Sequence, residues 1–343
     1  MNAPGMTLVI AAVLNLLGCA SSGPLQPFAA DAAQRWPAPP QLARVHYVRS
    51  FSSPGELGLR PGVWDRFIGL LVGSERSRIM RPMGLAVTPD AGLVAVADPG
   101  AGCVHRFDLA HARYDCLPGP DRSRLPSPIG VAVEPDGTLY TTDSALAQVF
   151  TAAPNAREFR RLELSPPVAQ PTGIALAGGE GLLYVTDTEN HVVRVYDASG
   201  SLVREIGGRG GEAGRFNYPT YVWSGDGEIL VSDSLNFRIQ RFDAAGGSTG
   251  MFGRPGDGSG DMQRPKGLAA DVHGHIYVAD ALSGALQIFD RSGRLLLSIG
   301  GKGQAPGQFW LPAGVAVTSG GLIFVADSFN HRVQVFRHAE AIP

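Results

Sequence analysis

A proline starts the same pattern six times along this 343-residue chain, and in five of the six a glycine follows two residues later. The prolines are spaced 43 to 48 residues apart: Pro82, Pro128, Pro171, Pro219, Pro265 and Pro312. Each begins a segment that ends, 14 to 16 residues later, in an aspartate after an apolar run: Asp98, Asp143, Asp187, Asp233, Asp280 and Asp327. A repeat of this period must be interpreted before any single motif, because it sets the architecture of the whole chain.

Each repeat contains about four short strands. A loop and a second apolar run follow every aspartate, as in HVVRVYD and RIQRFDA, and a last run such as LLLSIGG leads into a glycine-rich turn. The 45 glycines and 26 prolines, with hardly any long helical pattern, are typical of strands joined by tight turns. Six such units predict an all-β fold, a six-bladed β-propeller of four-stranded blades over residues 42–338.

The sixth repeat has only three strands before the chain ends. The segment VHYVRSF, residues 45–51, alternates as a strand does and precedes the first repeat. We predict that it is the fourth strand of the last blade. Such closure would remove two sheet edges that could otherwise pair with other chains.

The units resemble NHL repeats, whose motif ends in Asp-Ser-x-Asn-His-Arg and an apolar residue. The segment VADSFNHRVQVF at 325–336 matches that motif in full, VSDSLNFRIQRF matches closely, and VTDTENHVVRVY keeps the Asn-His pair. The other three units keep only the aspartate. The resemblance spans roughly residues 42–337 and implies a propeller that binds through the face carrying the loops from strand 4 to 1 and from strand 2 to 3.

The N-terminus reads as an export signal. An apolar run at residues 7–17, too short for a comfortable membrane span, ends in Leu-Leu-Gly-Cys at 16–19. This ending resembles the lipobox of bacterial lipoproteins, so we expect a signal peptide over 1–19, lipidation of Cys19, and outer-membrane retention facing the periplasm. Because residues 1–18 contain no Lys or Arg, an uncleaved anchor or a simple secretory peptide is the alternative.

Two segments lie outside the repeats. Residues 20–41, rich in Ala and Pro, are expected to be a flexible tether. An insertion at 56–80 places Trp64, Phe67, Ile68 and Leu71 on one face of a short predicted helix. We expect this helix to cap the propeller, with contact to lipid or a partner as the alternative.

Two cysteines, Cys103 and Cys116, lie in a segment that reads as strand, turn, strand. A hairpin centred near residues 109–110 would bring them close enough for a disulfide, which an exported protein can keep oxidised. Two free thiols are the alternative.

The six aspartates invite a catalytic interpretation, but a residue type repeated at one position of every blade is expected from architecture. Such aspartates can accept N–H groups of the following turn, whereas catalysis normally needs one asymmetric group of residues. A triad of Asp327, Ser328 and His331 lacks a recognisable oxyanion hole. We therefore predict no catalytic residue.

A metal in the central channel would need acids or histidines on the inner strands. Those strands read GLAV, GVAV, GIAL, YVWS, GLAA and GVAV, without either. The histidines at 105, 191, 273, 275 and 331 are scattered over outer strands and loops. The sequence predicts no metal and no cofactor, and a channel hydrolase or lyase with a divalent metal is the alternative function.

Residues that break the repeat indicate where a partner binds. Around one mouth of the channel they supply aromatic and cationic groups, which are favoured anchors for peptides and proteins. The predicted face consists of Arg81, Tyr218, Tyr221, Trp223, Arg264, Lys266 and Trp310. The alternative is that Tyr221 and Trp223 only plug the channel.

The first functional hypothesis is therefore a non-catalytic binding module of the cell envelope, for a protein, peptide or glycan. A net charge of −2 without a basic stripe argues against a nucleic-acid partner.

Overall fold

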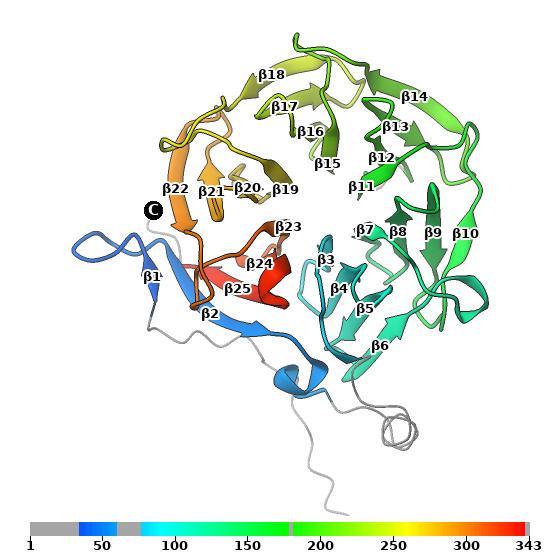
Figure 1. Ribbon diagram of the computed structural model, residues 1–343, viewed down its shortest axis with the longest axis horizontal. Coiled ribbons are helices and arrows are strands. Elements are labelled where there is room, and N and C mark those ends of the chain that lie inside the picture. Colours follow the sequence, from blue (N-terminus) through cyan, green and yellow to red (C-terminus); the bar gives the residue numbers. More distant parts are fainter. Residues whose placement is uncertain (1–33, 60–76, 178–180, 340–343) are drawn as a thin grey trace, which may run out of the picture.

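The computed structural model describes residues 34–59, 77–177 and 181–339, and these form a ring of six antiparallel sheets (Figure 1). In every sheet the strand that follows the repeat proline is innermost and later strands lie successively further out. The prediction of an all-β, six-bladed propeller is confirmed. Within the described ranges no helix is long and apolar enough to cross a membrane.

The strands of the first three blades alternate in direction from the channel to the rim. Blade one holds β3 (Leu85–Val87), β4 (Leu93–Asp98), β5 (Cys103–Asp108) and β6 (Arg113–Leu117). Blade two holds β7 (Pro128–Val133), β8 (Leu139–Asp143), β9 (Gln148–Ala152) and β10 (Arg160–Leu162). Blade three holds β11 (Pro171–Leu176), β12 (Leu183–Asp187), β13 (Val192–Tyr196) and β14 (Leu202–Gly207).

The other three blades follow the same order. Blade four holds β15 (Pro219–Gly225), β16 (Glu228–Asp233), β17 (Arg238–Asp243) and β18 (Ser248–Phe252). Blade five holds β19 (Pro265–Ala270), β20 (Ile276–Asp280), β21 (Ala285–Phe289) and β22 (Leu295–Gly300). Blade six holds β23 (Pro312–Val317), β24 (Leu322–Asp327) and β25 (Arg332–His338), and three short 3-10 helices, η1 (Pro54–Leu57), η3 (Pro120–Arg122) and η4 (Ser328–Asn330), lie in loops.

Blade six is completed from the other end of the chain. Strand β2 (Val45–Phe51) pairs antiparallel with β25, with Val45 opposite His338 and Phe51 opposite Val333. Figure 1 shows the blue strand β2 beside the red strand β25. The predicted closure by residues 45–51 is therefore confirmed. Its cause is apolar packing on both sides of β2, since Val45 is buried in the core between blades five and six, and Val48 and Phe51 are buried in the core between blades six and one.

The blade extends further than the sequence indicated. Strand β1 (Arg35–Trp36), inside the segment expected to be tether, pairs with β2 and makes this sheet five-stranded. The Trp36 ring packs edge-on against Phe336 at 5.7 Å between centroids. The tether expected over 20–41 therefore extends too far toward the C-terminus, because Arg35–Trp36 pairs with β2 and the Trp36 ring packs on the blade. Residues 60–76, with most of the predicted helical insertion, and Cys19 lie outside the described residues.

The inner strands are packed too closely for side chains at one position. Two residues after the proline, five blades have glycine, and a Cβ at Gly130 or Gly267 would lie 2.3 or 2.1 Å from a carbonyl oxygen of the next blade. Blade four places Tyr221 there. In the five blades with glycine, the close approach of neighbouring inner strands leaves no room for a side chain at this position.

Side-chain hydroxyl groups form hydrogen bonds between neighbouring blades. In four blades the residue after the aspartate is Ser or Thr, and its hydroxyl donates to the carbonyl of the proline that starts the next blade. The bonds are Ser144 to Pro171 at 2.6 Å, Thr188 to Pro219 at 2.7 Å, Ser234 to Pro265 at 2.6 Å and Ser328 to Pro82 at 2.5 Å. The last of these closes the ring between blade six and blade one.

Candidate functional site

The six repeat aspartates are fully buried at the end of the second strand of each blade. Their carboxylates accept backbone N–H groups from the loop that enters the inner strand. Asp98 accepts from Met80 and Arg81 at 2.6 and 2.9 Å, and Asp327 accepts from Trp310 at 2.7 Å. These contacts support the interpretation of the aspartates as structural, because each carboxylate ties one loop of its blade to another.

The segment 325–336, which contains the full motif, carries no catalytic triad. Asp327 accepts hydrogen bonds from Asn330 at 2.8 Å, Arg332 at 2.8 Å and Gln334 at 3.0 Å. Ser328 donates across the ring closure to Pro82, and the imidazole Nδ1 of His331 contacts the carbonyl of Met80. Both groups are therefore engaged with the backbone that leads into blade one.

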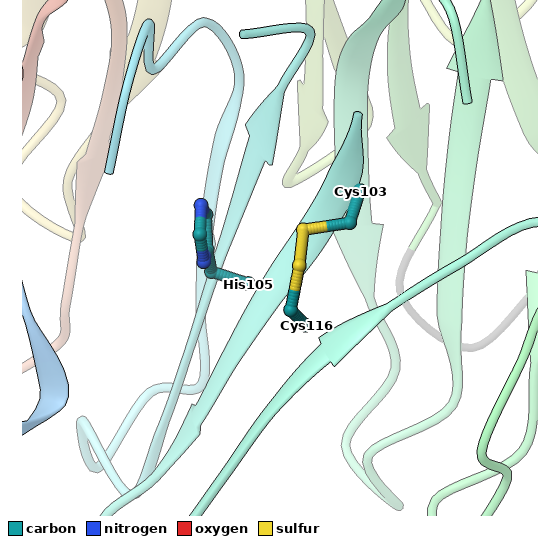
Figure 2. A group of neighbouring side chains, drawn as sticks. All are labelled: Cys103, His105 and Cys116. Atoms are coloured by element: carbon teal, nitrogen blue, oxygen red, sulfur yellow. A yellow bond between two sulfur atoms is a disulfide. The ribbon is translucent and has the colours of Figure 1, made fainter. Parts of the chain in front are cut away.

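Blade one carries a disulfide between Cys103 and Cys116, with Cα atoms 5.7 Å apart (Figure 2). His105 lies on the same strand, and its ring nitrogens contact Asp98 Oδ2 at 3.1 Å and the Tyr114 hydroxyl at 2.8 Å. Burial raises the pKa of Tyr114. Burial also opposes ionisation of Asp98, but the hydrogen bond from His105 and the charge of His105 outweigh it and keep the Asp98 pKa below its usual range. With both sulfurs in the disulfide, this cluster has no thiolate to offer a metal and keeps a single histidine.

One face of the ring carries most of the exposed apolar surface. The loop entering each inner strand and the loop leaving each second strand lie at the same end of a blade, because the repeat proline pairs with the repeat aspartate. Among the described residues, six of the ten exposed large hydrophobic side chains lie in these loops: Met80, Leu146, Tyr218, Leu282, Trp310 and Phe329. We call this the loop face.

Aromatic pairs order part of the loop face. The Tyr218 ring meets His191 edge-on at 4.6 Å between centroids, and the Tyr218 backbone N–H donates to His191 Nδ1 at 3.1 Å. Burial, and then the charge of Arg209, lower the pKa of His191, which favours the neutral ring that this bond requires. Trp310 packs against Phe329 at 6.1 Å.

Three cations also belong to the loop face. Arg81 precedes the proline of blade one, Arg264 precedes the proline of blade five, and both are exposed. Lys266 follows the proline of blade five. Burial, and then the positive charges of Arg264 and Arg81, lower the pKa of Lys266. Within residues 34–59, 77–177 and 181–339, none of the three side chains pairs with a carboxylate. In the described part of the chain, the mouth therefore holds three cations without a paired carboxylate.

Two residues expected on this surface belong to the core instead. Tyr221 is 8 % exposed and packs with Leu230 and Met262 between blades four and five, and Trp223 packs against the same cluster. The sequence pattern places them on the surface because they interrupt a row of small residues. In the structure, their side chains instead fill space between blades four and five. The Tyr221 hydroxyl is buried, has no hydrogen-bond partner in the described part of the chain, and its pKa is raised by that burial.

The sequence interpretation gave no role to several groups that the structure brings together. The His191 ring packs against Tyr218, and the Phe329 ring packs against Trp310. These contacts follow from the strand register and are not visible in the sequence. Asp271, His275 and His338 gather on the opposite face of the ring. The signal for that cluster was His-x-His after an aspartate, in a turn where no other blade has histidine.

Comparison with known families supports the repeat assignment. Residues 169–196 and 309–336 match the family described as NHL repeat. These are blades three and six, whose motifs retain the Asn-His pair. No curated protein matches the sequence significantly.

Solved structures share the fold at low sequence identity. A protein of unknown function from Bacteroides thetaiotaomicron aligns with a TM-score of 0.60 at 15% identity, covering 77% of this chain and 70% of that one. A catalytically inactive virginiamycin B lyase from Staphylococcus aureus, with quinupristin, aligns with a TM-score of 0.54 at 17% identity, covering 77% and 96%. A nidogen–laminin complex aligns with a TM-score of 0.51 at 18% identity, covering 63% and 79%.

Proposed function

We propose that this NHL-repeat β-propeller is a non-catalytic binding module of the bacterial cell envelope. A lipid on Cys19 anchors it to the outer membrane, facing the periplasm, and the loop face binds a protein, peptide or glycan that presents an anionic group. The observation that carries the proposal is the gathering, on one face, of exposed apolar side chains and uncompensated cations.

The apolar part of the loop face supports a macromolecular partner. Large exposed hydrophobic groups that gather on one side of a soluble domain usually mark an interaction site. Tyr218 and Trp310 are 42 % and 49 % exposed, and each is held by a second ring, so little side-chain freedom would be lost on binding. Aromatic anchors of this kind dominate many interfaces.

The cations support an anionic group in that partner. Lys266 is half-buried next to two like charges, an arrangement that costs free energy in the unbound protein. A carboxylate, sulfate or phosphate placed among the three cations would reverse that cost and form charge-assisted hydrogen bonds.

Replacement of Lys266 by methionine, the residue that blade one has at the equivalent position (Met83), tests the cationic part of the proposal. Because the Lys266 pKa is lowered on folding, the unfolded chain binds more protons between that lowered pKa and about 10.4, and wild-type stability rises with pH across that range. K266M should therefore melt at a higher temperature than wild type near neutral pH and lose binding to the anionic partner. A variant that melts lower and binds normally would contradict the proposal.

Photo-crosslinking in cells tests the face itself. A crosslinking amino acid at Trp310 should capture a defined partner, and the added K266M change should abolish that capture. The matched control is the same amino acid at Val272, 67 % exposed in a turn at the opposite end of blade five. Equal capture from both positions, or capture at Trp310 that K266M leaves intact, would remove the loop face from consideration. Cys19→Ser with labelled fatty acid tests the anchor separately.

A lyase with a metal in the channel is the second candidate, because the fold neighbours include virginiamycin B lyase. The six inner strands carry no acid and no histidine in their described residues, so they provide no ligands of the usual kind. Incubation of the purified protein with quinupristin and divalent metal, followed by mass spectrometry, decides between the candidates. Cleavage of quinupristin would favour the lyase.

A further inference from the structure

We propose that Asp271, His275 and His338 form a binding site for a divalent transition-metal ion such as Zn²⁺, on the face opposite to the loop face. One potential ligand atom from each of the three residues lies within 4.8 Å of the other two. The site joins blade five to blade six, at the point where the two ends of the ring meet. It is independent of the partner proposed for the loop face.

Blade five supplies two ligands from the turn between β19 and β20. The Asp271 carboxylate accepts the backbone N–H groups of His273 and His275, each at 2.9 Å, and Gly274 has a φ of +82° that tightens the turn. This folds His275 back so that its Nδ1 lies 2.8 Å from Asp271 Oδ2. The other blades whose turn carries an aspartate, such as Asp136 in blade two, have no histidine beside it.

Blade six supplies the third ligand from the end of β25, the strand with which the closing strand β2 pairs. His338 is the last residue of β25, and its backbone N–H donates to Gly321 at 3.0 Å. Its ring stacks on His275 with 5.9 Å between centroids. The next residue, Ala339, donates to Arg44 at 2.8 Å. Both sides of the site are thus held by backbone hydrogen bonds before any ion binds.

Tyr277 orients the ligands. Its hydroxyl is fully enclosed, donates to Asp271 Oδ2 at 2.8 Å and contacts His338 Nε2. An enclosed hydroxyl of this kind is the outer hydrogen bond that metal-binding carboxylates and imidazoles normally have, and it fixes their direction. Burial opposes ionisation of Asp271, but hydrogen bonds from His275 and Tyr277 outweigh it and keep the Asp271 pKa below its ordinary value.

The donor set selects the class of ion. Two imidazoles and one carboxylate suit Zn²⁺, Co²⁺, Ni²⁺ or Cu²⁺, whereas Mg²⁺ and Ca²⁺ prefer oxygen ligands throughout. In binding, each neutral imidazole gives a nitrogen lone pair to the ion and keeps its proton on the other nitrogen. Three protein ligands leave further positions for water. An ion there would connect the turn of blade five to the end of β25 in blade six.

Titration of the tag-free, full-length protein with Zn²⁺ and Co²⁺ tests the site. We expect one ion per chain, a visible Co²⁺ absorption band from nitrogen and oxygen ligands, and a melting temperature that rises when Zn²⁺ is added. His275→Gln and His338→Gln should each weaken binding by at least about tenfold, since each removes a ligand. Circular dichroism of both variants without metal establishes that they fold.

The matched control is His111→Gln. His111 Nδ1 lies 2.9 Å from Asp108 Oδ1, a histidine–carboxylate pair of the same geometry but without a third ligand. It should leave binding unchanged. No Zn²⁺ or Co²⁺ binding by the unaltered chain at 100-fold molar excess would overturn the proposal, and so would equal binding by the folded H275Q and H338Q variants. If neither variant folds, the cobalt spectrum of the unaltered chain decides, because absence of that band overturns the site.

Discussion

Blade six and blade one have a buried aspartate at the equivalent position, but different side chains bond to it. In blade six, Asp327 accepts from an asparagine, an arginine and a glutamine located three, five and seven residues later. Blade four repeats that arrangement around Asp233. In blade one, the residues at the same distances from Asp98 are Ala101, Cys103 and His105.

Blade one carries a disulfide where blade six has an arginine. Arg332 of blade six also donates to the carbonyls of Ala305 and Gln308, and so connects the third strand of blade six to the loop that arrives from blade five. Cys103 occupies the position of that arginine and bonds covalently to Cys116 on the fourth strand. The disulfide therefore joins two strands of one blade, whereas the arginine joins its blade to the loop from the preceding one. The Asp98 carboxylate is bonded to His105 instead of to an arginine.

The two blades also differ in how they are completed, and removal of residues 1–51 should have the largest effect. Blade one is continuous in sequence, whereas blade six depends on β2. Each buried apolar side chain of β2 contributes about 1.5–3 kcal/mol, and three of them approach the total stability of an ordinary domain, about 5–15 kcal/mol. We expect the shortened chain to lose cooperative melting, measured by circular dichroism. Cooperative melting at an unchanged temperature would show that closure contributes little.

Replacement of the buried aspartate should have the next largest effect on stability, and the loss should differ between blade six and blade one. Asp327→Asn leaves the Arg332 guanidinium without its carboxylate, which we expect to cost about 3–5 kcal/mol. Asp98→Asn removes a bond to a histidine and should cost about 1–3 kcal/mol. Denaturant unfolding of both variants measures the difference, and equal losses would mean that the arginine adds nothing.

The Asp98 loss should also depend on pH. Its pKa is lowered in the folded protein, so its contribution is complete at neutral pH and is lost as the pH falls below about 4. D98N and wild type should therefore converge in stability in acid. A constant gap down to pH 2 would show that the hydrogen-bond geometry, rather than the charge, carries the effect.

Opening of the disulfide should have an effect no larger than the upper end of the range expected for Asp98→Asn. Cys103 and Cys116 are 13 residues apart, and a loop of that size confers ~3 kcal/mol at most in the chain-entropy treatment. The double variant Cys103→Ser, Cys116→Ser should unfold at a lower denaturant concentration, and reducing agent should have the same effect on wild type but none on the variant. A wild type that is insensitive to reducing agent would show that the hydrogen bonds of Asp98 and His105 hold blade one without the disulfide.

The sequence alone predicted the architecture because its signals are local and repeated. The proline, glycine and aspartate positions recur in blade after blade, and each has a physical reason, from the close approach of inner strands at Gly130 to the N–H groups that Asp98 accepts. The closing strand was also predictable, since an unpaired edge in the last blade requires a partner.

The candidate sites depend on contacts between blades, which the sequence pattern does not encode. Tyr221 and Trp223 break the repeat just as Arg264 and Lys266 do, but the first pair turns between blades and the second toward the loop face. The cluster of Asp271, His275 and His338 joins a turn of blade five to a residue of blade six more than 60 positions later, and the three meet only when these two blades pack. Sequence therefore determined the blade and the number of blades, because those follow from short-range periodicity. Tertiary structure decided which exceptions face solvent and which meet one another, because that depends on how six blades pack side by side.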